Sequence, residues 1–285
     1  MAQQLHQEQL RQAKAHYDQD GYAIFRQVLD PDLIQEASSH IDWLLEKNPG
    51  VRPEQLHHYL MQHDPFWVRL VSDDRLLDIA ALFVGPNIAL FASHYISKPA
   101  YDGQAVLWHQ DGSYWPLEPM EVVTLFLAID DSLPENGCMR VIPGTQAMSL
   151  QKMRRRTDVD NVLNSEIDPS LVEESRAVDL ALKAGDVSVH HPNIIHGSNA
   201  NNSPRRRAAL TIRYIPTSTR IITADPWPSA FLLRGLAVAG VNLYQPRPQY
   251  REGTHMPFRG CVVLPVGGVR SLAIIWRMEG GERLN

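Results

Sequence analysis

The feature that most constrains the fold of this chain is a change of pattern after Gly85-Pro86-Asn87. Short apolar runs then follow one another, and turn-forming residues separate most of them, as in Asn136-Gly137, a dipeptide typical of hairpins. The runs cover residues 88–97, 105–109, 121–129, 138–142, 187–190, 207–215 and 260–265. Because no helical segments alternate with these runs, the pattern predicts a β-sandwich or a barrel.

The residues before this turn have a mainly helical pattern. Residues 6–18 are polar with sparse apolar positions, and residues 21–29 resemble a short strand. Asp30-Pro31-Asp32 is a helix start with proline near the first turn, and the apolar positions of residues 33–45 recur at helical spacing. Residues 54–84 continue in the same style. We therefore expect helices that pack on the outside of the β core.

Composition argues against several classes of partner for this chain. It has 27 basic and 32 acidic residues, and the net charge of −5 argues against a broad nucleic-acid surface. No apolar run approaches the ~18 residues that cross a bilayer, and the first residues lack the apolar core of a secretion signal. Cys138 and Cys261 form no Cys-x-x-Cys pair, so a reducing, cytoplasmic location is expected, with no membrane partner. The oligomeric state is left open.

A candidate metal-ligand pair lies in His109-Gln110-Asp111. About one His-x-Asp is expected by chance from composition, and His40-Ile41-Asp42 also fits. In a strand, residues i and i+2 project to the same face and can share a ligand, whereas in a helix they point about 200° apart. His109 and Asp111 end a β-like run, whereas His40 and Asp42 lie in a predicted helix. We therefore interpret the second pair as surface and cap-region polar groups.

A third ligand is available in the segment from Gly185 to Asn199. This segment has the pattern of a tight turn, a strand and then His196 in a loop that contains glycine. Two histidines and one carboxylate on one face of an octahedron leave three positions open, which is typical of non-haem Fe(II) oxygenases. Those positions accommodate a bidentate oxo acid and dioxygen.

The strand that follows has two chemically different faces. Ala208, Leu210, Ile212 and Tyr214 form an apolar face suited to packing on helices, and the alternate residues from Arg207 to Arg213 form a polar face toward a barrel interior. An inward guanidinium is a bidentate clamp for a carboxylate, such as the far end of 2-oxoglutarate. Arg213 lies six residues further on, about 20 Å along a strand. We therefore expect Arg213 to be structural or at the opposite end of the barrel.

Together these residues resemble the phytanoyl-CoA dioxygenase family of Fe(II)- and 2-oxoglutarate-dependent oxygenases. The resemblance runs in order over roughly residues 10–220. The motifs that carry it are His109-Gln110-Asp111, Tyr114-Trp115-Pro116-Leu117-Glu118-Pro119, residues 135–145 (ENGCMRVIPGT), Gly185-Asp186, His196-Gly197-Ser198 and Arg207, eleven positions after that histidine.

The resemblance implies a mainly β fold, a double-stranded β-helix (a jelly roll, cupin-like) with flanking N-terminal helices. It implies Fe(II) on His109, Asp111 and His196, and the C5 carboxylate of 2-oxoglutarate on Arg207. Ser198 would also contact this co-substrate. One single domain over residues 1–285 is expected, divided into a helical flank (1–85), the jelly-roll core (86–220) with a lid-like insert (151–180), and a C-terminal cover with closing strands (221–285).

The implied reaction is oxidation of an unactivated C–H bond in a small-molecule metabolite. Dioxygen and 2-oxoglutarate are consumed, and succinate and CO2 are released. Halogenases related to this family have a small residue in place of the ligand carboxylate. Because Asp111 is present, we expect a hydroxylase rather than a halogenase. Phe126 occupies a position where the family often has tryptophan, and it is a further expected contact of the co-substrate.

Other residues have two interpretations each. His94 could contact the co-substrate or be an ordinary core histidine, and Lys98 could face the pocket or end a strand at the surface. One of His190 and His191 could support the nearby third ligand, but the preferred interpretation is two ordinary strand-end histidines that point in opposite directions. Arg154–Arg156 could bind an anionic substrate from the lid, but a solvated basic loop is the preferred interpretation. The candidate substrate contacts are Trp108, Trp115, Trp227 and Arg234, although the residues around Trp227 and Arg234 would equally suit a packed cover or a dimer contact.

Two other classes of protein compete with the oxygenase. A zinc-type hydrolase would use the same ligands but needs a general-base glutamate near the histidines, as in HExxH, and none is found. It also leaves Arg207 without a role. A non-catalytic jelly-roll binding module would make the three ligands a coincidence, and it predicts a protein that binds neither Fe(II) nor 2-oxoglutarate.

Overall fold

The computed structural model describes residues 7–223 and 226–261, and its core consists of two antiparallel sheets. The order of the large sheet is β1 (Tyr22–Phe25), β11 (Val187–His190), β6 (Val123–Ala128), β13 (Ala209–Pro216), β3 (Ile88–Tyr95) and β15 (Phe231–Arg234), and β2 (Leu56–His57) also pairs with β3. The order of the small sheet is β10 (Val178–Leu180), β7 (Met139–Val141), β12 (His196–Ser198) and β4 (Val106–His109). The predicted jelly-roll class is confirmed, since strands distant in sequence are neighbours in both sheets.

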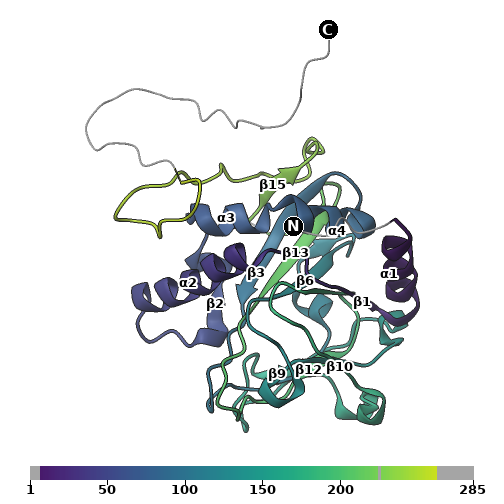
Figure 1. Cartoon of the computed structure of the whole chain (residues 1–285). Helices are drawn as coiled ribbons and strands as arrows, with labels where there is room; N and C mark the ends of the chain where they lie inside the picture. Colours follow the sequence, from purple (N-terminus) through teal and green to yellow (C-terminus); the bar gives the residue numbers. More distant parts are fainter. Residues whose placement is uncertain (1–6, 224–225, 262–285) are drawn as a thin grey trace, which may run out of the picture.

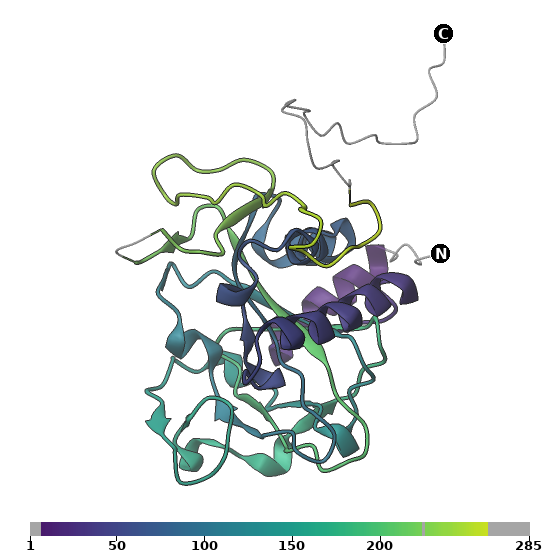
Figure 2. The same ribbon diagram turned by 90° about the vertical axis from the view of Figure 1, so that its left-hand side faces the viewer.

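Helices cover the large sheet on the side away from the small one. They are α1 (Gln7–Asp20), α2 (Pro31–Lys47), α3 (Pro65–Val71) and α4 (Asp74–Val84). In both views the small sheet lies below the helices, with the large sheet against them (Figures 1 and 2). None of these described helices is long and apolar enough to cross a membrane.

The predicted helical stretch of residues 54–84 is broken into several elements. Short 3-10 turns (Pro53–Gln55 and His58–Leu60) come before α3, and Ser72-Asp73 separates α3 from α4. The breaks occur at capping residues, because the side chain of Asp64 accepts from Trp67 N and that of Asp73 accepts from Arg75 N. Each of these bonds satisfies a backbone donor that a helix start leaves free.

The main core lies between the helices and the large sheet. The apolar face predicted for β13 packs there against the buried sides of α2, α3 and α4. It comprises Ala208, just before the strand, and Leu210, Ile212 and Tyr214. The opposite face of β13 turns toward the small sheet and the interior of the jelly roll. The two-faced interpretation of this strand is therefore confirmed.

His40 differs from its sequence interpretation as a surface group. It is fully buried on α2, its Nδ1 lies 3.0 Å from Tyr95 Oη, and its Nε2 lies 3.2 Å from Asp64 Oδ2. The reason is helical spacing, since position 40 shares a face with Ala37, Ile41 and the other buried positions of α2. The companion residue Asp42 is exposed, as expected.

The insert of residues 151–180 contains more structure than its sequence indicated. β8 (Arg154–Arg155) pairs with β9 (Ser165–Glu166), two 3-10 turns follow (Pro169–Leu171 and Glu174–Arg176), and β10 joins the small sheet beside β7. Another short pair, β5 (Leu117–Glu118) with β14 (Arg220–Ile221), was also not predicted. The strand expected at residues 260–265 lies largely outside the described residues.

Candidate metal centre

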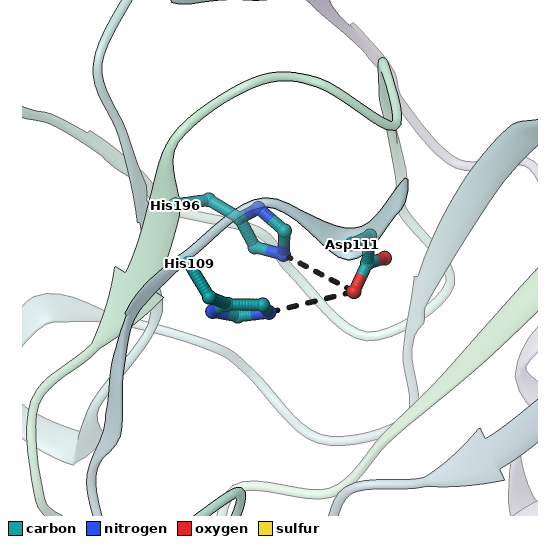
Figure 3. Close-up of side chains that lie close together, drawn as sticks. All are labelled: His109, Asp111 and His196. Carbon is teal, nitrogen blue, oxygen red and sulfur yellow. Dashed lines mark ion pairs between the residues drawn. The ribbon is translucent and has the colours of Figure 1, made fainter. Parts of the chain in front are cut away.

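Two neighbouring strands bring the three predicted ligands together. β4 ends at His109, Asp111 begins the 3-10 turn Asp111–Tyr114, and β12 begins at His196, directly opposite His109 in the β4–β12 register. The candidate ligand atoms all lie within 4.8 Å of one another, and all three residues are buried. Figure 3 shows the imidazoles of His109 and His196 facing Asp111, whose Oδ1 lies 3.4 Å and 3.9 Å from their Nε2 atoms.

The backbone orients both imidazoles. The Nδ1 atom of His109 lies 2.8 Å from Leu107 O, and that of His196 lies 3.1 Å from Ile194 O. A carbonyl can only accept, so each Nδ1 carries the proton and each Nε2 keeps a free lone pair directed at the centre. This is the arrangement in which protein histidines usually bind a metal.

The charge states at the centre also suit a divalent cation. Burial alone would raise the pKa of Asp111, but the Arg213 guanidinium and the contact with His190 hold it well below its usual range. Burial, together with His109 and His190, holds the pKa of His196 well below its usual value. A carboxylate and neutral imidazoles are the forms that ligate. In addition, Asp111 Oδ2 is buried without a hydrogen-bond partner among the described residues, so the donor set fits iron with an open side.

The central residue of the motif supports the centre from the opposite face. Gln110 is buried, and its Nε2 donates to Asn193 O at 2.7 Å while its Oε1 accepts from Gln151 N at 2.8 Å. The first bond ties the Asp111 segment to the loop before His196, and the second ties it to the start of the insert. Alternation of side chains explains why Gln110 points away from the two ligands that flank it.

A cavity of about 170 Å³ adjoins the three ligands and contains the predicted co-substrate residues. Arg207, Ser198, Phe126 and His94 all line it. Arg207 is almost completely buried, its Nη1 donates to Ile96 O at 2.9 Å, and its guanidinium carbon lies 5.5 Å from the centroid of the Phe126 ring. The aromatic face at position 126 is therefore used for a cation–π contact with the arginine.

Two residues lie nearer the centre than the sequence indicated. Arg213 lines the same cavity as Arg207, with Nη2 3.8 Å from Asp111 Oδ2, and is not at the opposite end of the barrel. The cavity extends along the inward face of β13, so residues several positions apart on this face both reach it. His190, interpreted as a strand-end residue, is fully buried with Nε2 3.5 Å from Asp111 Oδ2. His191 points the other way, toward Tyr17, as alternation requires.

The candidate substrate contacts separate into different regions. Trp115 lines the cavity. Trp108 packs instead against Ile142, Ile167 and Ile195, because alternation along β4 turns it away from the face of His109. Its expected role as a substrate contact is therefore corrected.

Trp227 and Arg234 are also outside the cavity lining. Trp227 stacks on Phe91 at 5.1 Å and donates from Nε1 to Phe91 O at 2.6 Å, so it supports the wall behind Trp115. Arg234 forms 2.7 Å ion pairs with Asp74 and Asp78 of α4. Both residues belong to a packed cover, which was the alternative interpretation of this segment.

Several residues of the cavity and its surroundings were not predicted from the sequence. Val162 and Leu163 from the insert line the cavity, and Tyr114, which also lines it, shares a 2.7 Å hydrogen bond with Ser165 Oγ. Apolar residues inside a charged segment were the signal that could have identified the insert residues. Lys98, for which a surface position was one interpretation, is fully buried, with Nζ directed at the carbonyls of Ser198 and Asn199.

Two arginines of the insert, Arg154 and Arg156, form ion pairs within it. Arg154 forms an ion pair with Asp168, and Arg156 forms ion pairs with Asp158 and Glu166. These contacts support the interpretation as a solvated basic loop. Neither of these two guanidinium groups is left free to bind a substrate.

A jelly roll with two histidines and one carboxylate at an open cavity defines the class of non-haem iron oxygenases. Comparison with known proteins identifies the family. The model of the phytanoyl-CoA dioxygenase family matches residues 17–209, and the chain belongs to this family. The chain is accordingly a 2-oxoglutarate-dependent non-haem iron oxygenase.

Curated relatives agree with this assignment, and a solved structure shares the fold. The chain is 27% identical to the ectoine dioxygenase of Sphingopyxis alaskensis, over 74% of this chain and 77% of that protein. It is 28% identical to the L-proline trans-4-hydroxylase of Streptomyces griseoviridis, over 72% and 86%. Its fold is similar to that of the non-heme monooxygenase ThoJ, with a TM-score of 0.68 and 24% identity, over 83% of this chain and 88% of that one.

Proposed function

We propose that this enzyme hydroxylates, or otherwise oxidises, an unactivated C–H bond of a small-molecule metabolite, with 2-oxoglutarate and dioxygen as co-substrates and succinate and CO2 as products. The observation that carries the proposal is the convergence of His109, Asp111 and His196 on a cavity that also contains Arg207. The similar proteins include an ectoine dioxygenase and an L-proline trans-4-hydroxylase, whose names indicate small-molecule substrates.

Each residue of the centre has a distinct proposed role. His109, Asp111 and His196 hold Fe(II), which when bound supplies the activation of dioxygen. Arg207 binds the C5 carboxylate of 2-oxoglutarate, because its charge is buried and its Nε has no hydrogen-bond partner among the described residues. Ser198 contacts the same co-substrate.

Three other residues complete the proposed cavity. Phe126 keeps the Arg207 guanidinium in place through its ring, and His94 lines the same cavity. Trp115 contributes to the wall against which substrate packs. Because Asp111 occupies the third ligand position, where a halide would otherwise bind, the expected outcome is hydroxylation rather than halogenation.

We also propose that the chain acts as one oxygenase domain, with residues 151–180 as its lid. Val162 and Leu163 line the cavity, and the Tyr114–Ser165 hydrogen bond connects the insert to the turn that carries Asp111. Both cysteines are free, which supports the expected reducing, cytoplasmic location.

The zinc-type hydrolase is the less favourable alternative. Glu54 lines the cavity, but its carboxylate accepts hydrogen bonds from Arg52 at 3.0 Å and from Gln104 N at 3.0 Å. A carboxylate held in this way is poorly suited to act as a general base. The binding-module alternative would leave the orientation of both Nε2 atoms toward Asp111 without a purpose.

The proposal predicts a visible charge-transfer band when the anaerobic Fe(II) protein is titrated with 2-oxoglutarate. In Arg207→Ala the band should fail to form at the same co-substrate concentration, because about 2–4 kcal/mol of charge-assisted binding is lost. Arg206→Ala is the matched control, since Arg206 pairs with Asp130 and Asp42. A wild-type protein that binds neither iron nor 2-oxoglutarate would refute the proposal and favour the binding module.

A further inference from the structure

A second buried arginine faces the cavity and has no role in the function proposed above. Arg213 lies in β13, and Arg207 lies two residues before this strand begins. Both guanidinium groups line the cavity beside the candidate metal ligands, and both residues are at most 6% exposed. A buried charge requires a partner, so the groups around Arg213 decide what it can bind.

One corner of the Arg213 guanidinium is fixed by the protein. Its Nη1 donates to Thr211 Oγ1 at 2.8 Å and lies 3.2 Å from His94 Nδ1. The hydroxyl of Thr211 in turn donates to His94 O at 3.1 Å. Trp115 covers one face of the group, with its ring centroid 5.5 Å from the guanidinium carbon. The side chain is therefore held in one orientation before any ligand binds.

The other edge of the same group lacks an acceptor. Among the described residues, Nε has no hydrogen-bond partner, and the closest carboxylate oxygen to Nη2 is Asp111 Oδ2 at 3.8 Å, beyond hydrogen-bonding distance. The Nε and Nη2 atoms carry parallel N–H bonds, a geometry that matches the two oxygens of a carboxylate.

Arg207 has a similar set of contacts. Its Nη1 is fixed by Ile96 O, its Nε is unpartnered, and Phe126 lies against its guanidinium at 5.5 Å. Both arginines line one cavity, and Arg213 lies on its Asp111 side, with Nη2 3.8 Å from Asp111 Oδ2. Because the C5 carboxylate of 2-oxoglutarate is assigned to Arg207, Arg213 is available for a different carboxylate.

The balance of charges in the cavity also favours an anion beside Arg213. Arg207 and Arg213 contribute two positive charges, and Asp111 contributes one negative charge, while Glu54 is neutralised by Arg52 outside the lining. The charges of Fe(II) and of the 2-oxoglutarate dianion would cancel each other. One positive charge therefore remains uncompensated at the position of Arg213, and an anionic substrate would compensate it.

We propose that Arg213 binds a carboxylate of the substrate, so that the molecule oxidised by this enzyme is an organic acid anchored beside the metal centre. This inference rests on the proposed function, because it assigns 2-oxoglutarate to Arg207. It places the acid group on the Asp111 side of the cavity, next to Trp115. The carbon that is oxidised would then be close to the carboxylate, within a small cavity.

The test uses the anaerobic Fe(II) protein saturated with 2-oxoglutarate, and its probes are propionate and benzoate, each compared with its amide. In the wild type, the acids should perturb the charge-transfer band saturably and the amides should not. In Arg213→Gln the dissociation constants for the acids should rise about tenfold or more. Arg213→Lys should recover part of this loss, and Arg234→Gln, which removes a surface arginine, should have no effect.

Several outcomes would overturn the inference. They are equal responses to acid and amide, no saturable response to either acid, and unchanged acid affinity in Arg213→Gln. If Arg213→Gln instead loses the band itself, Arg213 acts on the metal or on 2-oxoglutarate and not on substrate. Calorimetric titration of the metal-free protein with the same four compounds tests Arg213 separately, so a failure of the proposed function would remain distinguishable.

Discussion

At the scale of single residues, the centre depends on which nitrogen of each histidine is free. The carbonyls of Leu107 and Ile194 hold Nδ1 of His109 and His196, so neither ring has to change its tautomer to accept a cation. The buried carboxylate of Asp111 supplies the single negative charge of the ligand set. Removal of any one ligand leaves an incomplete set.

We therefore expect His109→Ala, Asp111→Ala and His196→Ala each to abolish succinate release and to lower the iron content of the purified protein. Circular dichroism should show that the fold is retained. His16→Ala is the control, because His16 is exposed on α1 and does not line the cavity. Substantial turnover in all three ligand variants would contradict the assignment of the centre.

The candidate ligand set could be predicted from sequence because alternation in a strand distinguishes His109-x-Asp111 from the helical pair at His40. The same rule, applied to Trp108, would have turned it away from the cavity, as the structure does. Arg213 could not be placed this way, because strand geometry gives distance along β13 but not the extent of the cavity. Contacts between distant segments, such as His190 with Asp111, have no local signal.

At the scale of elements, a buried polar network joins α2, α3 and β3. His40 of α2 lies between Tyr95 Oη at 3.0 Å and Asp64 Oδ2 at 3.2 Å, and Asp64 also caps α3 through Trp67 N. The network fixes the two helices against the outer face of β3. The opposite face of this strand lines the cavity through His94.

Replacement of Asp64 by Ala should lower the free energy of unfolding by about 2–4 kcal/mol, because it removes a helix cap and the buried carboxylate that lies 3.2 Å from His40 Nε2. Urea denaturation of Asp64→Ala measures this loss, and Asp42→Ala, at an exposed position of α2, should change stability by less than about 0.5 kcal/mol. Equal losses in both variants would show that the network does not stabilise the helices.

The same carboxylate predicts a dependence of stability on pH. Burial alone would raise the pKa of Asp64, but its contact with His40 and the bond from Trp67 N hold it below its usual value. A group with a lowered folded pKa contributes stability above its unfolded pKa, about 4, and loses it as pH falls through the folded value. The stability difference between wild type and Asp64→Asn should therefore be constant above pH ~5 and shrink in stronger acid.

Prediction of strands from sequence succeeded for most of the apolar runs. β3, β4, β6, β7 and β11 fall within predicted runs, and β13 overlaps one, whereas β10 and β12, with three residues each, were not predicted as strands. Their strand conformation depends on pairing with β7, which joins both of them. The break between α3 and α4 could have been found from its capping residues, because Ser72-Asp73 is a typical helix start.

At the scale of the whole molecule, the candidate ligands come from β4 and β12, which are far apart in the sequence. Metal binding should therefore increase the stability of the folded chain. A metal that binds only the folded state stabilises it by about 2.7 kcal/mol at a concentration 100 times its dissociation constant. We expect Ni(II), which avoids turnover, to raise the melting temperature by several degrees, and 2-oxoglutarate to add a further increase. Scanning calorimetry of Arg207→Ala should keep the first increase and lose the second. A Ni(II) effect that persists in His196→Ala would indicate binding elsewhere.

The direct opposition of His109 and His196 across β4 and β12 has a kinetic consequence. A cation held by both would act as a cross-link that closes a long loop of chain, which includes β6, β7, the insert and β11. The two strands could then separate only after one imidazole has released the cation. The metal-loaded protein should therefore unfold more slowly than the metal-free protein, and a chelator should remove this difference.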